Sequence, residues 1–245
     1  MSAYKLGLVS VSFRKHTPEE ILSAMENAGL SWIEWGSDVH CPPEKAAEIA
    51  ALQARHNIIC CSYGTYFRLG VTSMEELPNY IAAAKVLGTD ILRLWCGNKD
   101  SGEYSAEEKA ALFTDCKAAA ELAKKSGVTL CMECHINTYT NTKESALELM
   151  QAVDSRYFRM YWQPSQYTTE EENLAYAKLL APYTTHLHVF NWKGEEKYPL
   201  LEARDIWRQY LKCFPGNKAL LLEFMPDGKL ETLAQEAQAL REITE

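Results

Sequence analysis

Four strand-like segments of this chain end on a residue whose side chain could hold a metal ion. These residues are Glu133, Gln163, His188 and Glu223. The successive gaps of 30, 25 and 35 residues are each about the length of one strand and one helix. A closed parallel barrel brings the ends of its strands to one rim. The spacing therefore predicts that all four side chains share a single site at a barrel mouth.

The elements that must position these residues follow from β-rich and helical runs that alternate eight times. Predicted strands cover residues 6–11, 32–35, 58–62, 91–95, 128–133, 158–162, 185–190 and 219–223. Predicted helices cover residues 17–29, 42–56, 73–87, 105–125, 142–153, 169–180, 205–213 and 229–243. Helical connections between strands indicate crossovers and a parallel sheet. Eight such units predict an α/β fold, a single (β/α)8 TIM barrel spanning residues 1–245.

The alternation of side chains along a strand predicts which ones face the barrel interior. If the Glu133 carboxylate points inward, the apolar Leu130 and Met132 face the helices. On the last strand the same rule turns Glu223 inward and Phe224 outward.

Three further interior positions carry polar side chains. Glu34 on the second predicted strand and Arg93 on the fourth would share one interior layer, which predicts a buried ion pair. His186 lies deeper on its strand than His188, and we expect it to be a hydrogen-bonded core histidine.

Composition narrows the classes of partner. The chain has 33 acidic and 25 basic residues, a net charge of −8, and no basic stripe, which argues against nucleic acid as a partner. The first residues contain too short an apolar run for a signal peptide, and no run of about 18 apolar residues occurs. The sequence predicts a soluble cytoplasmic protein without a membrane segment.

Eight cysteines are scattered along the chain, many of them within apolar segments. We expect them to be reduced and to act as small hydrophobic side chains. Cys131 and Cys134 form a CysXXCys pattern, but residues three apart on a strand point to opposite faces. This pair is interpreted as packing rather than a zinc or redox site.

Five motifs give the chain a resemblance to the xylose-isomerase-like TIM-barrel family of sugar phosphate isomerases and epimerases. They are TrpIleGluTrpGlySerAspValHis (32 to 40), MetGluCysHis (132 to 135), TrpGlnProSer (162 to 165), HisLeuHisValPheAsnTrpLys (186 to 193) and LeuLeuLeuGluPhe (220 to 224). The resemblance covers nearly the whole chain, and the order and spacing of the motifs are more specific than any one of them.

The resemblance implies a divalent metal ion bound by Glu133, Gln163, His188 and Glu223. Family members usually carry Asp at the second of these positions, in an AspProGlyHis-like turn, whereas this chain has GlnProSerGln. The amide lowers the ligand charge by one, which predicts weaker metal binding. This donor set suits Mn²⁺, our first choice, or Mg²⁺, Co²⁺ or Zn²⁺.

Such a site suits removal of a proton next to a carbonyl group through an enediolate. Glu133 and Glu223 are the expected base and acid, and the carbon that receives the proton decides between epimerisation and isomerisation. The expected substrate is a small sugar or polyol, with or without a phosphate. The candidate substrate-binding residues are His40, His135, Trp95, Trp162, Lys193 and Arg204.

Three other interpretations compete with the isomerase. A lyase that dehydrates an inosose or a dehydroshikimate-like compound starts with the same proton removal. A metal-poor, non-catalytic sugar-binding relative is favoured by Gln163. A DNA repair enzyme related to endonuclease IV is disfavoured by the acidic composition. Assembly into a homo-oligomer through the rim loops stays open.

Overall fold

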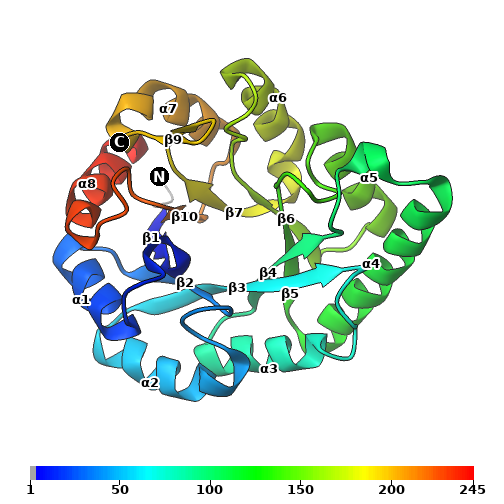
Figure 1. Cartoon of the computed structure of the whole chain (residues 1–245), viewed down its shortest axis with the longest axis horizontal. Helices are drawn as coiled ribbons and strands as arrows, with labels where there is room; N and C mark the ends of the chain where they lie inside the picture. Colours follow the sequence, from blue (N-terminus) through cyan, green and yellow to red (C-terminus); the bar gives the residue numbers. More distant parts are fainter. Residues whose placement is uncertain (1–3) are drawn as a thin grey trace.

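Eight parallel strands close into a barrel in the computed structural model, which describes residues 4–245. The strands are β1 (Lys5–Val9), β2 (Trp32–Gly36), β3 (Ile59–Leu69), β4 (Ile91–Cys96), β5 (Thr129–Glu133), β6 (Phe158–Trp162), β7 (Thr184–Val189) and β10 (Ala219–Leu222). Strand β10 pairs with β1 and completes the circle (Figure 1). The predicted (β/α)8 TIM barrel is confirmed.

Eight helices form the outer ring. They are α1 (Pro18–Ala28), α2 (Ala46–Arg55), α3 (Leu77–Leu87), α4 (Ala106–Ser126), α5 (Lys143–Val153), α6 (Glu170–Leu180), α7 (Arg204–Cys213) and α8 (Leu233–Thr244). The expected start of α1 is present, because Thr17 and Glu20 form a reciprocal capping box. Gly29 ends this helix in the left-handed conformation, with φ of 66°. Among residues 4–245, no helix combines the length and apolar composition needed to cross a membrane.

Two apolar layers lie on either side of the strands. Cys131 and Tyr161 belong to a small cluster inside the barrel, whereas Leu130 and Met132 belong to the large layer between strands and helices. This arrangement confirms the predicted parity of β5. Phe224 is an exception: it was expected to face outward, yet it packs against the interior cluster. Its positive φ of 55° breaks the strand alternation directly after β10.

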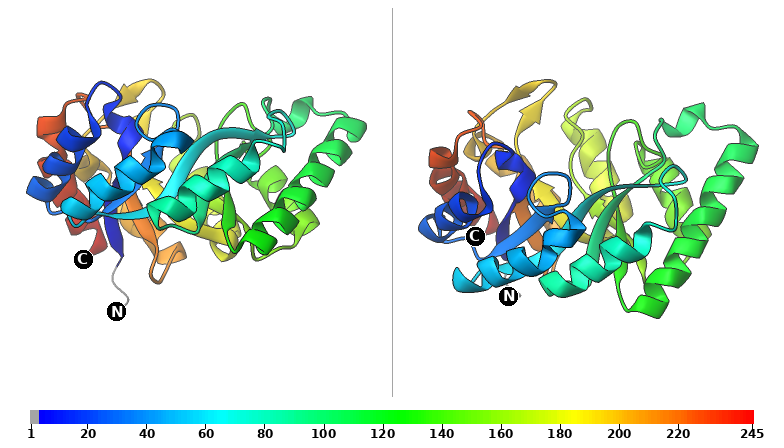
Figure 2. Two further views of the ribbon diagram at one scale, coloured as in Figure 1. Left: turned by 90° about the horizontal axis from the view of Figure 1, so that it is seen from below. Right: turned by 60° about the horizontal axis from the view of Figure 1, so that its bottom comes forward.

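Two elements differ from the sequence-based prediction. Strand β3 continues to Leu69 rather than ending near residue 62, and its pairing with β4 is irregular between Gly64 and Arg68. A glycine within a strand is a poor strand signal, which explains the early predicted end. The loop after β7 contains a short hairpin, β8 (Trp192–Lys193) with β9 (Glu196–Lys197). In Figure 2 this gold hairpin projects from the rim of the barrel.

The cysteines are all free thiols, and seven of the eight are buried. Cys131 lies in the interior cluster and Cys134 in the outer layer, so the two side chains face opposite sides of the strand wall. The predicted opposite orientation of these two side chains is confirmed.

Candidate metal centre

The ends of three strands bring two carboxylates and an imidazole together. Glu133 ends β5, His188 lies near the end of β7, and Glu223 directly follows β10. One possible ligand atom from each of these residues lies within 4.8 Å of the other two. His188 Nδ1 is 3.3 Å from Glu133 Oε1 and 3.5 Å from Glu223 Oε2.

Gln163 completes the group from the turn after β6. Its Oε1 lies 2.9 Å from His188 Nδ1, so it approaches the same nitrogen as the two carboxylates. The Gln163 side chain is largely buried, and His188 is completely buried. The structure therefore brings all four residues of the predicted site to one place.

The spacing of these atoms fits a divalent cation. Protein ligands lie about 2.0–2.2 Å from ions such as Zn²⁺. Two ligands on the same ion, at right or tetrahedral angles, are then about 2.8–3.6 Å apart. The contacts to His188 Nδ1 span 2.9 to 3.5 Å and fall within this range. Two carboxylate oxygens, an amide oxygen and an imidazole nitrogen form a donor set for a hard or borderline ion.

A buried arginine fixes one side of the site. Arg93 Nε is 2.7 Å from Glu34 Oε1, and its Nη1 is 2.6 Å from Glu133 Oε2. The Trp95 indole N–H also donates to Glu133 Oε2. The predicted ion pair between Glu34 and Arg93 is confirmed, and it extends to Glu133. Because two donors occupy Oε2 of Glu133, its Oε1 is the oxygen that faces His188.

Glu34 connects this ion pair to the other side of His188. Its Oε1 is 3.4 Å from His188 Nε2, and its Oε2 accepts a hydrogen bond of 2.6 Å from Ser62. The Ser62 hydroxyl in turn lies 3.0 Å from the Tyr161 hydroxyl. The predicted core histidine, His186, is also buried, and its Nδ1 lies 3.2 Å from the Ala219 backbone N–H.

The ionisable groups of the site have strongly shifted pKa values. Burial alone would raise the pKa of Glu34, but the positive charges of Arg93 and His188 outweigh it and lower that pKa to about 2. The same charges lower the pKa of Glu133 well below its usual value. For Glu223, burial prevails and raises the pKa. Burial opposes the charged form of His188, yet Glu223 and Glu34 raise its pKa to about 10.

Comparison with known proteins places this barrel in a family. The sequence profile described as "Xylose isomerase-like TIM barrel" matches residues 22–210, which is more than half of the chain. The protein belongs to the xylose isomerase-like TIM barrel family. The resemblance inferred from the motifs is thereby confirmed.

Individual members of the family are distant in sequence. A 3-dehydroshikimate dehydratase from Bacillus anthracis is 22% identical over 228 residues, which cover 83% of this chain and 77% of that protein. The structure of an L-ribulose 3-epimerase superposes with a TM-score of 0.77 at 15% identity, covering 99% of this chain and 94% of that one. A structure of IolI protein with a bound zinc atom gives a TM-score of 0.72 at 16% identity, covering 98% and 96% of the two chains.

In this xylose isomerase-like barrel, one predicted substrate contact points away from the mouth. Trp162 is completely buried and packs against Trp207 and Phe214, between the barrel and its helices. It follows Tyr161, which faces inward, so alternation turns its own side chain outward. Trp162 was therefore wrongly predicted as a sugar contact. Arg204 lies exposed at the start of α7, where it contacts Asp205.

His40 also differs from its predicted role on a rim loop. It is buried, with Nδ1 3.1 Å from Ser10 Oγ and Nε2 3.2 Å from the carbonyl oxygen of His16. Both ring nitrogens thus have protein partners. This arrangement argues for a structural role and against contact with a substrate.

Trp95 and His135 do lie beside the four candidate ligands. Their rings stack, with centroids 5.0 Å apart and planes inclined by 29°. The Arg68 guanidinium group lies 4.1 Å from the centroid of the Trp95 ring. Because the indole N–H donates to Glu133, Trp95 positions a candidate ligand.

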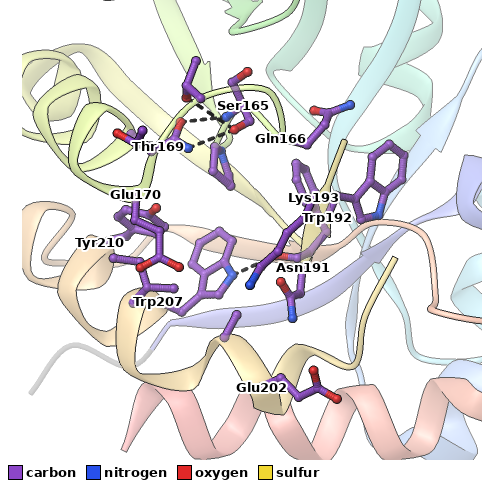
Figure 3. Close-up of a pocket in the computed structure, with 16 residues that line it drawn as sticks. Ser165, Gln166, Thr169, Glu170, Asn191, Trp192, Lys193, Glu202, Trp207 and Tyr210 are labelled. Carbon is purple, nitrogen blue, oxygen red and sulfur yellow. Dashed lines mark hydrogen bonds between the residues drawn. The ribbon is translucent and has the colours of Figure 1, made fainter. Parts of the chain in front are cut away.

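A side pocket of about 330 Å³ lies between the turn after β6, the β8–β9 hairpin and α7 (Figure 3). Lys193 and Gln166 are among its lining residues. The Trp207 indole N–H, drawn in the figure, donates to the Phe190 carbonyl oxygen at 2.8 Å. Lys193, one of the predicted substrate contacts, thus lies at this side pocket.

Residue spacing and strand parity could identify the four candidate ligands and the pair of Glu34 and Arg93. The contact between Glu34 and His188 was not predicted. Both residues were expected to face inward, and that shared direction is the only sequence signal for their contact.

Proposed function

We propose that this protein is a divalent-metal-dependent isomerase or epimerase of a small sugar or polyol. It would act by removing a proton from the carbon next to a carbonyl group. The convergence of Glu133 and Glu223 on His188 Nδ1 carries this proposal, because it sets two carboxylates from separate strands around one point.

The proposed metal ligands are Glu133 Oε1, Gln163 Oε1, His188 Nδ1 and a carboxylate oxygen of Glu223, with Mn²⁺ as the preferred ion. When bound, the ion would polarise the substrate carbonyl group and acidify the neighbouring C–H bond. IolI protein, a relative in fold, has been crystallised with zinc, which supports metal binding by this architecture.

The carboxylates of Glu133 and Glu223 differ in the hydrogen bonds that hold them. Oε2 of Glu133 accepts hydrogen bonds from Arg93 and Trp95, which hold this side chain in place. Within residues 4–245, no hydrogen-bond donor contacts the Glu223 carboxylate, although His188 Nδ1 lies 3.5 Å away. We therefore assign the first proton removal to Glu223, which is free to exchange a proton with a substrate.

Glu133 is the partner of Glu223 in the second transfer. Its Oε1 faces the shared centre. In an epimerisation Glu133 would take up a second proton from solvent and pass it to the opposite face of the carbon, while Glu223 keeps the proton that it removed. Transfer of the proton to the neighbouring carbon gives an aldose–ketose isomerisation instead. His135 and Trp95, which stack beside Glu133, are proposed to line the substrate site.

A dehydratase is the second candidate. The relative from Bacillus anthracis that supports it is named as a 3-dehydroshikimate dehydratase. Dehydration also starts with a proton next to a carbonyl group and then expels a neighbouring hydroxyl as water. The same carboxylates serve both reactions, and the products separate them.

Proton NMR in deuterium oxide tests both candidates. Mn²⁺-loaded protein is incubated with a panel of ketoses and, separately, with 3-dehydroshikimate, and manganese is removed with a chelator before the spectra are recorded. An epimerase inserts deuterium at the carbon beside the carbonyl group and accumulates an epimer. A dehydratase yields a conjugated product that absorbs in the ultraviolet. Absence of deuterium exchange across both panels, with metal bound, would contradict the proposed chemistry.

A further inference from the structure

A group of buried side chains with polar ends lies directly below the candidate ligands, and the proposed proton transfers do not use it. Its members are Glu34, Ser62, Arg93 and Tyr161, none more than 3% exposed. We propose that Glu34 is a positioning residue that holds His188 with Nδ1 toward the metal and Nε2 toward the barrel interior. The inference rests on the proposed function only in requiring a metal ion at Nδ1.

The two nitrogens of His188 have different surroundings. Nδ1 faces oxygen atoms of Gln163, Glu133 and Glu223 within 3.5 Å. Nε2 is buried and makes no hydrogen bond of good geometry with any residue from 4 to 245. Its near neighbour is Glu34 Oε1, at 3.4 Å.

The chemistry of a ligating histidine gives this neighbour a role. A neutral imidazole that binds a metal through Nδ1 carries its proton on Nε2. That N–H needs an acceptor, and metal-binding histidines usually donate it to a carboxylate, a carbonyl oxygen or water. Glu34 Oε1 is the carboxylate oxygen placed to receive it.

Glu34 is itself held firmly enough to orient another side chain. Arg93 Nε donates to Oε1 at 2.7 Å, and Ser62 donates to Oε2 at 2.6 Å. Since the single hydroxyl hydrogen of Ser62 is used on Glu34, the contact of 3.0 Å to Tyr161 has the tyrosine as donor. The Tyr161 ring also lies against the His188 ring, with centroids 4.7 Å apart.

The first experiment compares two substitutions of the same type. Glu34→Gln keeps the size of the side chain and removes its charge. Glu236→Gln does the same at a buried glutamate that accepts a hydrogen bond from the Leu200 N–H, away from the centre. Zn²⁺ affinity is measured by competition with a chelator. We expect Glu34→Gln to weaken Zn²⁺ binding about 10- to 100-fold, as loss of the hydrogen-bond partner of a ligating histidine does. Glu236→Gln should change the affinity less than about threefold.

A second measurement uses the wild-type protein, so it does not depend on whether a variant folds. Nitrogen-15 NMR of histidine-labelled, Zn²⁺-loaded protein reports the state of each ring nitrogen. We expect His188 to show a metal-bound Nδ1 and a protonated Nε2 that exchanges slowly with water. In Glu34→Gln the Nε2 proton should exchange faster.

Three results would overturn the inference. They are Zn²⁺ affinity of Glu34→Gln within about threefold of wild type, coordination through Nε2, and a wild-type protein that takes up no metal. None of these measurements uses a substrate. A strong effect of Glu34→Gln in a protein without isomerase, epimerase or dehydratase activity would sustain the positioning role and reject the proposed function.

Discussion

At the scale of single residues, the two glutamates of the centre are chemically unequal. Glu133 has one oxygen held by Arg93 and Trp95, whereas the described part of the chain offers the Glu223 carboxylate no hydrogen-bond donor. The less constrained carboxylate of Glu223 suits the first proton removal, whereas the fixed Glu133 is a ligand that acts only in the second transfer.

This contrast predicts the outcome of Glu223→Gln. The amide keeps an oxygen for the metal but cannot take up a proton, so turnover should fall by about 10²- to 10⁴-fold. Metal content, measured by mass spectrometry, should change much less than turnover. A variant that still exchanges the substrate proton for deuterium at the wild-type rate would assign the base to another residue.

Replacement of Gln163 by aspartate is expected to strengthen metal binding rather than weaken it. Its amide oxygen already lies 2.9 Å from His188 Nδ1, so a carboxylate at this position would add a negative charge to the centre. We expect Gln163→Asp to tighten Mn²⁺ binding at least several-fold, measured by calorimetry. Gln163→Asn, equally short but neutral, is the matched control. Unchanged or weaker binding by the aspartate variant would show that residue 163 is not a ligand.

Single residues also show where sequence reasoning stops. Glu133 and Glu223 were recognisable because each ends a strand, and parity placed both inward. Trp162 also lies at a strand end, yet it packs among the helices, because alternation turns its side chain outward and a place at a strand end does not by itself direct a side chain to the mouth. His40 was predicted to contact substrate on a rim loop. Its actual partners, Ser10 and His16, lie 30 and 24 residues earlier, in the segment after β1, and their contact with His40 follows only from the folded structure.

At the scale of elements, β3 approaches the buried ion pair through a glycine. A Cβ atom on Gly64 would lie 2.5 Å from Glu34 Oε1 and 2.6 Å from Arg93 Nη2. The backbone of this strand therefore supplies room that a side chain would take. The same glycine led to a predicted end of β3 that is too early. Gly64 therefore weakens the strand signal in the sequence and also leaves space for Glu34 and Arg93 in the structure.

Gly64→Ala should consequently damage both stability and metal binding. The added methyl group must displace Glu34 or Arg93, and overpacking of this kind costs about 1–3 kcal/mol of unfolding free energy. Thermal unfolding and Mn²⁺ titration measure the two effects. Gly102→Ala, where the new methyl group would meet no atom within 4 Å, should leave both nearly unchanged. Equal behaviour of the two variants would mean that the strand shifts without cost.

At the scale of the whole molecule, the centre joins residues from β5, β6, β7 and β10, which lie far apart in the sequence. Its four candidate ligands can come together only when the barrel is closed. A metal ion at this centre should therefore bind the folded chain far more tightly than the unfolded one. The closed topology was predictable from eight alternating units, but the depth and shape of the mouth were not, because loops such as the β8–β9 hairpin carry no strong periodic signal.

Addition of metal should accordingly raise the melting temperature. At a free Mn²⁺ concentration of about 100 times the dissociation constant, the stabilisation is about 2.7 kcal/mol. For a chain of this size that corresponds to a rise of roughly 5–10 °C, measurable by scanning calorimetry. The rise should be reversed by a chelator and strongly reduced in His188→Ala. A melting temperature indifferent to Mn²⁺, Zn²⁺ and Co²⁺ would indicate that the centre holds none of them.

The positions of the thiols allow unfolding of the barrel to be followed by chemical labelling. Seven cysteines are buried, and burial raises the pKa of Cys41 and of Cys131 to about 12, so neither thiolate forms at neutral pH. Cys213, at the end of α7, is partly exposed. A disulfide reagent should label this one position slowly in the native protein and reach the other seven only as fast as the chain unfolds. At a reagent concentration high enough for labelling to outpace refolding, the labelling rate of these seven thiols equals the unfolding rate, without a denaturant or an engineered probe.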